Sequence, residues 1–246
     1  MIQQRVLVFD IETTPITAYV WGLKDQNIGL NQIVKDWSVM AWGAKWLGEK
    51  KVMYQDVRHN RDFYDDTKIL KPLWSLLDEA DTVITQNGQS FDGPKLNSRF
   101  IMHGMNPPSP YRHLDTYRIV KRTTEFTSNK LEYLTDKLCT KYKKLHHSKF
   151  PGMSLWVECL KGNQEAWKEM QVYNVHDVLS TEELYLKLQP WVPEAMPQPY
   201  KKVEDKRICG RCGGTLRSNG WQYTNHYKYQ RLQCRACNAY IKGEKV

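Results

Sequence analysis

The order of apolar and polar positions over the first 190 residues predicts a mixed α/β domain. Short apolar runs typical of strands occur at residues 5–10, 37–47, 52–54, 82–86 and 112–114. Apolar residues at three- and four-residue spacing, typical of one face of a helix, occur within residues 69–77, 96–100, 131–138 and 164–188. Prolines then follow at Pro190, Pro193, Pro197 and Pro199. Because proline cannot continue a helix, this segment is predicted to be an extended connector.

Length and composition fit one full domain followed by a small module. The chain has 246 residues, 41% of them hydrophobic, and no apolar run approaches the ~18 residues of a membrane span. We predict an α/β domain over residues 1–192, a proline-rich linker over 193–207 and a small module over 208–246. The N-terminus lacks the cationic and long apolar segments of a secretory signal, so we expect a cytoplasmic protein.

The net charge of +9 is concentrated near the C-terminus. The whole chain has 36 basic and 27 acidic residues, whereas residues 200–246 have 11 basic and 3 acidic ones. A basic segment of this kind favours a polyanionic partner such as nucleic acid.

Two acidic residues lie at the end of the first predicted strand. Side chains two positions apart on a strand point to the same face, so Asp10 and Glu12 are expected side by side, after the apolar residues Val6 and Val8. Neighbouring carboxylates repel each other unless a cation lies between them, and oxygen ligands favour Mg²⁺ or Mn²⁺. On its own, the motif is common, and a solvated strand end explains it better than a metal site.

Two predicted helices carry further acidic residues. Asp92 lies at the start of the helix that follows the fourth predicted strand, where an aspartate caps the helix, and it can bind metal from there as well. On the long helix, Asp177 lies on a stripe that is otherwise apolar except for Thr181, so its charge requires a cation. Tyr173 lies four residues earlier on the same face.

Together these segments resemble the three motifs of the DEDD exonucleases, which have a ribonuclease H-like fold. The motifs are D-x-E at Asp10 and Glu12, N-x3-F-D at Asn87, Phe91 and Asp92, and Y-x3-D at Tyr173 and Asp177. The tyrosine is typical of the DEDDy branch, which includes the proofreading domains of family B DNA polymerases. Residues 114–117 and 128–134 add to the likeness, which spans roughly residues 5–189.

The resemblance implies a mixed central sheet flanked by helices, and hydrolysis from the 3′ end by two Mg²⁺ or Mn²⁺ ions that releases nucleoside monophosphates. It implies that Asp10, Glu12 and Asp177 hold the ion that generates hydroxide, and that Asp10 and Asp92, partly through water, hold the ion at the leaving oxygen. With an unperturbed pKa of about 10, Tyr173 is expected to orient the water or the phosphate. Nucleic-acid contacts are expected from Asn87 and Phe91.

Four cysteines near the C-terminus form two C-x2-C pairs: Cys209, Cys212, Cys234 and Cys237. In a chain expected to be cytoplasmic, this spacing predicts a metal site rather than disulfides, and four thiolates suit one tetrahedral Zn²⁺. Residues 221–223 and 227–232 alternate as strands, which completes the pattern of a zinc ribbon. Redox chemistry at the cysteine pairs is the alternative.

Aromatic and basic residues alternate around the second cysteine pair. They are Trp221, Tyr223, Tyr227, Lys228, Tyr229, Arg231 and Arg235. This mixture suits base stacking and phosphate contacts on a single strand or junction. The alternatives are that some of these rings form the core of the ribbon, or that the ribbon binds a replication or recombination protein. A second basic stretch, from Arg118 to Lys149 and including Lys144, either follows the substrate strand or forms a solvated helix face.

These features predict a metal-dependent 3′–5′ exonuclease that acts on single-stranded DNA or DNA 3′ ends and grips its substrate with the ribbon. The alternatives are a structure-specific endonuclease on the same fold and a non-catalytic DNA-binding adaptor. The chain has no G-x-x-x-x-G-K-[ST] loop, so we expect no ATP-driven step, and we expect no membrane association. The compactness of the chain and the family resemblance favour a viral or bacterial origin, and therefore a location in the cytoplasm of a bacterial or phage-infected host cell.

Overall fold

The computed structural model describes residues 4–145, 149–192, 207–224 and 227–246. The strands are β1 (Val6–Thr13), β2 (Thr17–Ala18), β3 (Ile33–Lys35), β4 (Val39–Trp46), β5 (Met53–Asp56), β6 (Thr82–Thr85), β7 (Arg112–Asp115), β8 (Leu216–Tyr223), β9 (Lys228–Cys234) and β10 (Tyr240–Lys245). The helices are α1 (Thr67–Glu79), α2 (Asp92–Met102), α3 (Thr116–Thr123), α4 (Leu131–Leu138), α5 (Ser154–Leu160) and α6 (Gln164–Leu188), with 3-10 turns η1 (Leu30–Gln32) and η2 (Gln189–Trp191). The predicted linker, 193–207, lies outside the described residues except for Arg207.

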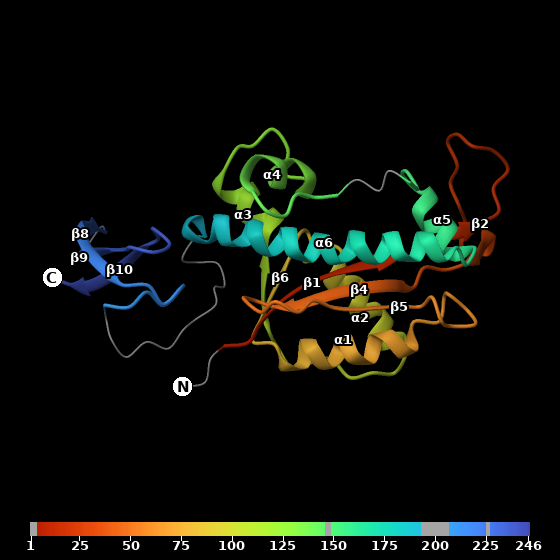
Figure 1. Ribbon diagram of the computed structural model, residues 1–246, viewed down its shortest axis with the longest axis horizontal. Coiled ribbons are helices and arrows are strands. Elements are labelled where there is room, and N and C mark those ends of the chain that lie inside the picture. Colours follow the sequence, from red (N-terminus) through yellow and green to blue (C-terminus); the bar gives the residue numbers. More distant parts are fainter. Residues whose placement is uncertain (1–3, 146–148, 193–206, 225–226) are drawn as a thin grey trace.

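A five-stranded mixed sheet in the order β5-β4-β1-β6-β7 forms the centre of the fold. β4 pairs antiparallel with β1 and β5, whereas β6 pairs parallel with β1 and β7. Helix α6 crosses one face of this sheet, and α1 and α2 cover the other (Figure 1). The predicted fold class, a ribonuclease H-like mixed sheet flanked by helices, is confirmed.

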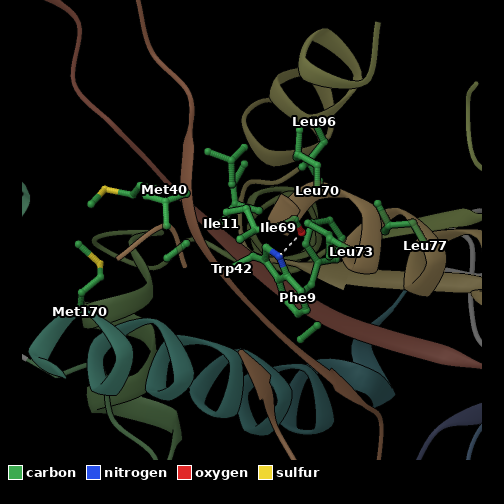
Figure 2. Close-up of a cluster of buried hydrophobic side chains, with 14 of the residues drawn as sticks. Phe9, Ile11, Met40, Trp42, Ile69, Leu70, Leu73, Leu77, Leu96 and Met170 are labelled. Carbon is green, nitrogen blue, oxygen red and sulfur yellow. Dashed lines mark hydrogen bonds between the residues drawn. The ribbon is translucent and has the colours of Figure 1, made fainter. Parts of the chain in front are cut away.

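The side chains of β1 alternate between two buried clusters. Phe9 and Ile11 pack with α1 and α2, together with Trp42, whose indole Nε1 donates a hydrogen bond to the carbonyl of Ile69 at 2.7 Å (Figure 2). Val6 and Val8 instead pack with α3, α4 and the second half of α6. Because strand side chains alternate, the next residues on the face of Val6 and Val8 are Asp10 and Glu12.

Helix α6 begins at a cap and lies unusually close to the sheet. The Asn163 side chain accepts hydrogen bonds from the backbone N–H groups of Glu165 and Ala166, which fixes the first turn. Further along, Gly43 of β4 faces α6, and a Cβ at this glycine would lie 2.7 Å from Asn174 Oδ1. The missing side chain therefore permits the close approach of helix and strand. No helix within the described ranges is both long and apolar enough to cross a membrane.

The C-terminal module is an antiparallel sheet in the order β10-β9-β8 that carries the four cysteines. Two strands were predicted, and the structure adds β10 as a third. The module touches the end of α6 (Figure 1): Arg211 Nη1 donates to the carbonyl of Gln189 at 3.1 Å, and Gln189 Nε2 donates to the carbonyl of Arg211 at 3.3 Å.

Candidate active site

Three of the predicted carboxylates converge where β1 meets α6. Asp10 and Glu12 lie on the strand face turned towards α6, and Asp177 lies on the helix. One oxygen of each lies within 4.8 Å of the others. The alternation of side chains along β1 and the close packing of α6 on the sheet thus bring the first and third motifs together.

Asp92 is buried next to this cluster but is not one of the three. Its Oδ1 accepts a hydrogen bond from the backbone N–H of Ile11 at 3.1 Å, so the carboxylate is tied to β1 between the two strand acids. The prediction that Asp92 caps its helix is wrong, because the cap position of α2 is Phe91 and Asp92 is the first helical residue. Its carboxylate accepts hydrogen bonds from the strand and, at the helix start, from the backbone N–H of Asp92 itself.

The cluster is electrostatically strained without a cation. Burial, followed by the charges of Asp92, Glu12 and Asp177, holds the pKa of Asp10 well above its usual range. Burial and then Asp177 raise the pKa of Glu12 to about 8. Burial also raises the pKa of Asp92 to about 7, against the opposing hydrogen bond from Ile11. An oxygen-only donor set with this excess of negative charge fits a hard divalent cation such as Mg²⁺ or Mn²⁺.

Lys144 supplies a positive charge at the edge of the cluster. Its Nζ lies 2.7 Å from Asp177 Oδ2 and 4.8 Å from the centre of the Tyr173 ring. Burial alone would lower the pKa of Lys144, but Asp177 and Tyr173 outweigh it and keep the ammonium charged. Sequence reasoning placed Lys144 only in a basic stretch, because nothing local distinguishes it from its neighbours.

Tyr173 projects into the same site, as predicted. Burial and the neighbouring Asp177 raise its pKa above the usual range, so its hydroxyl stays protonated. Its ring packs edge-on against Trp156 of α5, with ring centres 6.1 Å apart, and Trp156 also hydrogen-bonds the Glu12 carboxylate. Asn174 Nδ2 donates to Asp10 Oδ2 at 2.8 Å. Sequence reasoning missed Trp156 and Asn174, since both contacts are long-range.

The turn of the second motif is held by an aspartate from β7. Asp115 accepts hydrogen bonds from the backbone N–H groups of Asn87, at 2.8 Å, and Gln89, at 3.1 Å, and also caps α3. Asn87 itself is in the left-handed region, at φ 65°. The segment 114–117, which contributes to the family resemblance, therefore shapes this turn.

A pocket of about 310 Å³ opens between the turn and Lys144, lined by Gln86, Asn87, Tyr117, Asn129, Lys130, Leu131, Glu132 and Lys144. Asn87, a predicted nucleic-acid contact, thus lies at this pocket. Phe91, the other predicted nucleic-acid contact of this motif, is 39% exposed at the start of α2.

The four cysteines of the module lie within 4.8 Å of one another. The Sγ atoms of Cys212 and Cys234 are 3.5 Å apart, and those of Cys209 and Cys237 are 3.9 Å apart. Burial opposes ionisation of Cys234, but backbone N–H groups of Cys237 and Ala236 donate to its Sγ and lower its pKa to about 7. Clustered thiols with such donors are compatible with a zinc ribbon.

The predicted nucleic-acid contacts of the ribbon fall on both faces of its sheet. Trp221, Tyr223 and Lys228 share one face, and Tyr229 and Arg231 lie on the other, as strand alternation and pairing require. Two more contacts lie beyond the ends of β9, and both are exposed: Tyr227 and Arg235. All seven remain predictions.

Comparison with known proteins agrees with the fold. The profile of the RNase_H superfamily matches residues 7–189. Among solved structures, the chain is similar to the family B DNA polymerase from the hyperthermophilic archaeon Pyrobaculum calidifontis, with a TM-score of 0.55 and 18% sequence identity. That match covers 76% of this chain but only 25% of the polymerase chain, so the likeness is one of fold over a quarter of the polymerase. No curated protein matches the sequence.

Proposed function

Because the chain belongs to the RNase_H superfamily, we propose that it is a nuclease, specifically a metal-dependent 3′–5′ exonuclease of DEDDy type that converts DNA to nucleoside monophosphates. The observation that carries this proposal is the convergence of Asp10, Glu12 and Asp177 within 4.8 Å. Four acids, one of them Asp92 beside the cluster, match the four carboxylates of that class.

The carboxylates would hold two Mg²⁺ or Mn²⁺ ions. Asp10, Glu12 and Asp177 would bind one ion, and Asp10 together with Asp92 would bind the other. When bound, two such ions lower the pKa of water and stabilise the attacking and leaving oxygens of a phosphodiester. The Asn174 amide and the Trp156 indole position the carboxylates of Asp10 and Glu12 for this purpose.

The remaining polar groups act on the substrate. Tyr173 keeps its proton and so donates a hydrogen bond to the attacking water or the scissile phosphate, rather than acting as a base. Lys144 places a positive charge beside Asp177, where it attracts the phosphate. The pocket between Asn87 and Lys144 is the place for the 3′-terminal nucleotide.

The ribbon would hold one structural Zn²⁺ on its four cysteines and grip the nucleic acid. Its described part has few fully buried apolar side chains, so metal binding would supply much of its stability.

The test is incubation with a 5′-labelled DNA strand in Mg²⁺. A ladder that shortens from the 3′ end supports the exonuclease. One discrete internal product would indicate the endonuclease, and binding without cleavage the adaptor. The purified Asp177→Asn variant controls for contaminating nucleases, and an RNA strand of the same sequence tests the preference for DNA.

A further inference from the structure

The two faces of the ribbon sheet carry different sets of side chains. Residues paired across neighbouring strands share a face, so the pairs Arg217–Gln233, Tyr240–Gln233, Lys242–Arg231 and Lys245–Tyr229 all project to one side. Tyr227, just before β9, joins this side, since its ring lies 6.3 Å from that of Tyr229. We name these residues the tyrosine face: Arg217, Tyr227, Tyr229, Arg231, Gln233, Tyr240, Lys242 and Lys245.

The opposite face carries the apolar side chains of the sheet and the acid, together with the cations Arg207 and Lys228. A cavity of about 610 Å³ on this side is lined by residues that include Leu216, Leu232 and Ile241, and Lys242 of the tyrosine face borders it from the sheet edge. Glu244, the only acidic residue between Arg207 and Val246, lines the same cavity. The tyrosine face therefore has four cations and no acid.

Each tyrosine of this face has a cation over its ring. Lys245 Nζ lies 3.3 Å from the ring centre of Tyr227, and Lys242 Nζ lies 3.8 Å from that of Tyr229. Arg231 Cζ lies 5.4 Å from the ring centre of Tyr240. Tyr227 and Tyr240 are each 49% exposed, so a planar ligand can reach them.

We infer that the tyrosine face binds single-stranded nucleic acid, with bases stacked on its tyrosines and phosphates held by its lysines and arginines. A base that stacks on a ring displaces the cation above it, and the cation then meets the neighbouring phosphate. Duplex ends offer few free base faces, whereas every nucleotide of a single strand offers one. This inference rests on the proposed function only for the assignment of a nucleic-acid substrate.

The inference also divides the residues predicted from sequence. Tyr227, Tyr229 and Arg231 belong to the binding face. Trp221 and Lys228, whose Nζ lies 4.1 Å from the indole centre, pair with each other on the other side of the sheet.

The test of this assignment is the affinity of the full chain for a 5′-fluorescein oligothymidylate, measured by fluorescence anisotropy. The buffer contains no Mg²⁺, so that the strand is not cleaved, and no chelator, so that the ribbon keeps its zinc. The double variant Lys242→Gln/Lys245→Gln removes two cations from the tyrosine face. The matched control, Arg207→Gln/Lys71→Gln, removes two cations from outside this face, because Arg207 lines the apolar cavity of the ribbon and Lys71 is exposed on α1. Zinc content confirms that both ribbons are folded.

The tyrosine-face variant should bind about tenfold more weakly, and its slope of log affinity against log salt should be shallower by about 1.4, because each lost single-strand phosphate contact removes about 0.7. The control should stay within about twofold of wild type. Photo-crosslinks from a 5-bromouracil strand should map to Tyr227, Tyr229 or Tyr240.

Equal weakening of both variants would reduce the effect to bulk charge and overturn the inference, as would crosslinks confined to Trp221 and Tyr223. The proposed function fails separately. A wild-type chain that binds through the tyrosine face yet leaves the strand intact in Mg²⁺ would overturn the nuclease and leave this binding site standing.

Discussion

At the scale of single residues, the candidate site concentrates negative charge that Lys144 offsets in part and that a bound divalent cation would relieve further. Asp177→Asn keeps the size of the side chain but removes one charge from the cluster. We expect cleavage to fall by at least about a hundredfold, the scale on which lost charge stabilisation in a transition state is felt. In Mg²⁺-free buffer the melting temperature should change little, because the reduced repulsion among the carboxylates is opposed by the loss of the ion pair with Lys144.

Tyr173→Phe is the milder partner of that variant, because it removes one neutral hydrogen bond and leaves the carboxylates in place. Its loss of activity should be about tenfold or less. Mg²⁺ should raise the melting temperature of the wild type and of Tyr173→Phe. It should raise the melting temperature of Asp177→Asn much less, because that variant lacks one of the proposed metal ligands. Equal activity of Asp177→Asn and wild type would remove this aspartate from the active site.

The buried side chain of His113 should make the free energy of unfolding depend on pH. Its Nε2 lies 2.8 Å from Thr85 Oγ1, and burial, aided by Arg118 and opposed by Asp115, lowers its pKa to about 4. As pH falls from about 6.5 to 4, the unfolded chain takes up this proton first, so the free energy of unfolding must fall.

His113→Gln retains a polar partner for Thr85 but cannot titrate. Urea unfolding at pH 7 and pH 4.5 should show that the wild type loses about 2 kcal/mol more than the variant between the two conditions. If both proteins lose the same free energy, His113 is not buried in its neutral form.

At the scale of elements, the close packing of α6 on β4 determines whether Asp177 reaches Asp10 and Glu12. In Gly43→Ala, the new methyl group would lie 2.7 Å from Asn174 Oδ1 and 3.0 Å from Val178 Cγ2, so the Asn174 side chain must turn away from Asp10 or α6 must move away from the sheet. We expect a loss of about 1–3 kcal/mol in the free energy of unfolding. Cleavage should fall as well, because the first change releases the Asp10 carboxylate and the second displaces Asp177 with the helix.

Gly22→Ala is the control for this variant, since its new methyl group would meet only the end of the Gln26 side chain, 3.2 Å away. Urea unfolding and cleavage of the labelled strand should both match wild type. Unchanged stability and activity in Gly43→Ala would mean that the helix does not depend on this close contact.

The elements that sequence reasoning predicted are those with a local signal. The bounds 164–188 agree with α6, because a sustained helical period follows the Asn163 cap, and the alternation of β1 placed Asp10 and Glu12 on one face. The short helices α3 and α5 and the strand β10 were not predicted, because packing rather than periodicity stabilises them. The position of Lys144 against Asp177, and the turn of Asp92 towards Ile11, depend on contacts between distant segments and have no local pattern.

At the scale of the whole molecule, the ribbon meets the nuclease fold at one end of the helix that carries Asp177 (Figure 1). The contact is made by Arg211, which lies between the first two cysteines and donates to the carbonyls of Gln189, at 3.1 Å, and Pro190, at 3.5 Å. A guanidinium at this place satisfies carbonyls at a helix end and complements the negative pole of the helix dipole. Metal binding by the cysteines would fix the loop that presents Arg211, so we expect zinc to stabilise the nuclease fold through this contact.

Arg211→Gln should lower the melting temperature of the nuclease fold by about 2–4 °C, the shift that about 1 kcal/mol produces in a chain of this size, while zinc content stays constant. Arg235→Gln is the matched control. Arg235 occupies the equivalent place between the second pair of cysteines, whereas the contact with the end of α6 is made by Arg211. A zinc chelator in Mg²⁺-free buffer should reproduce the shift in wild type and add little to it in Arg211→Gln, since both changes break the same contact. Fully additive effects would show that zinc stabilises the nuclease fold by another route, and an equal shift in Arg235→Gln would show that charge rather than the contact is responsible.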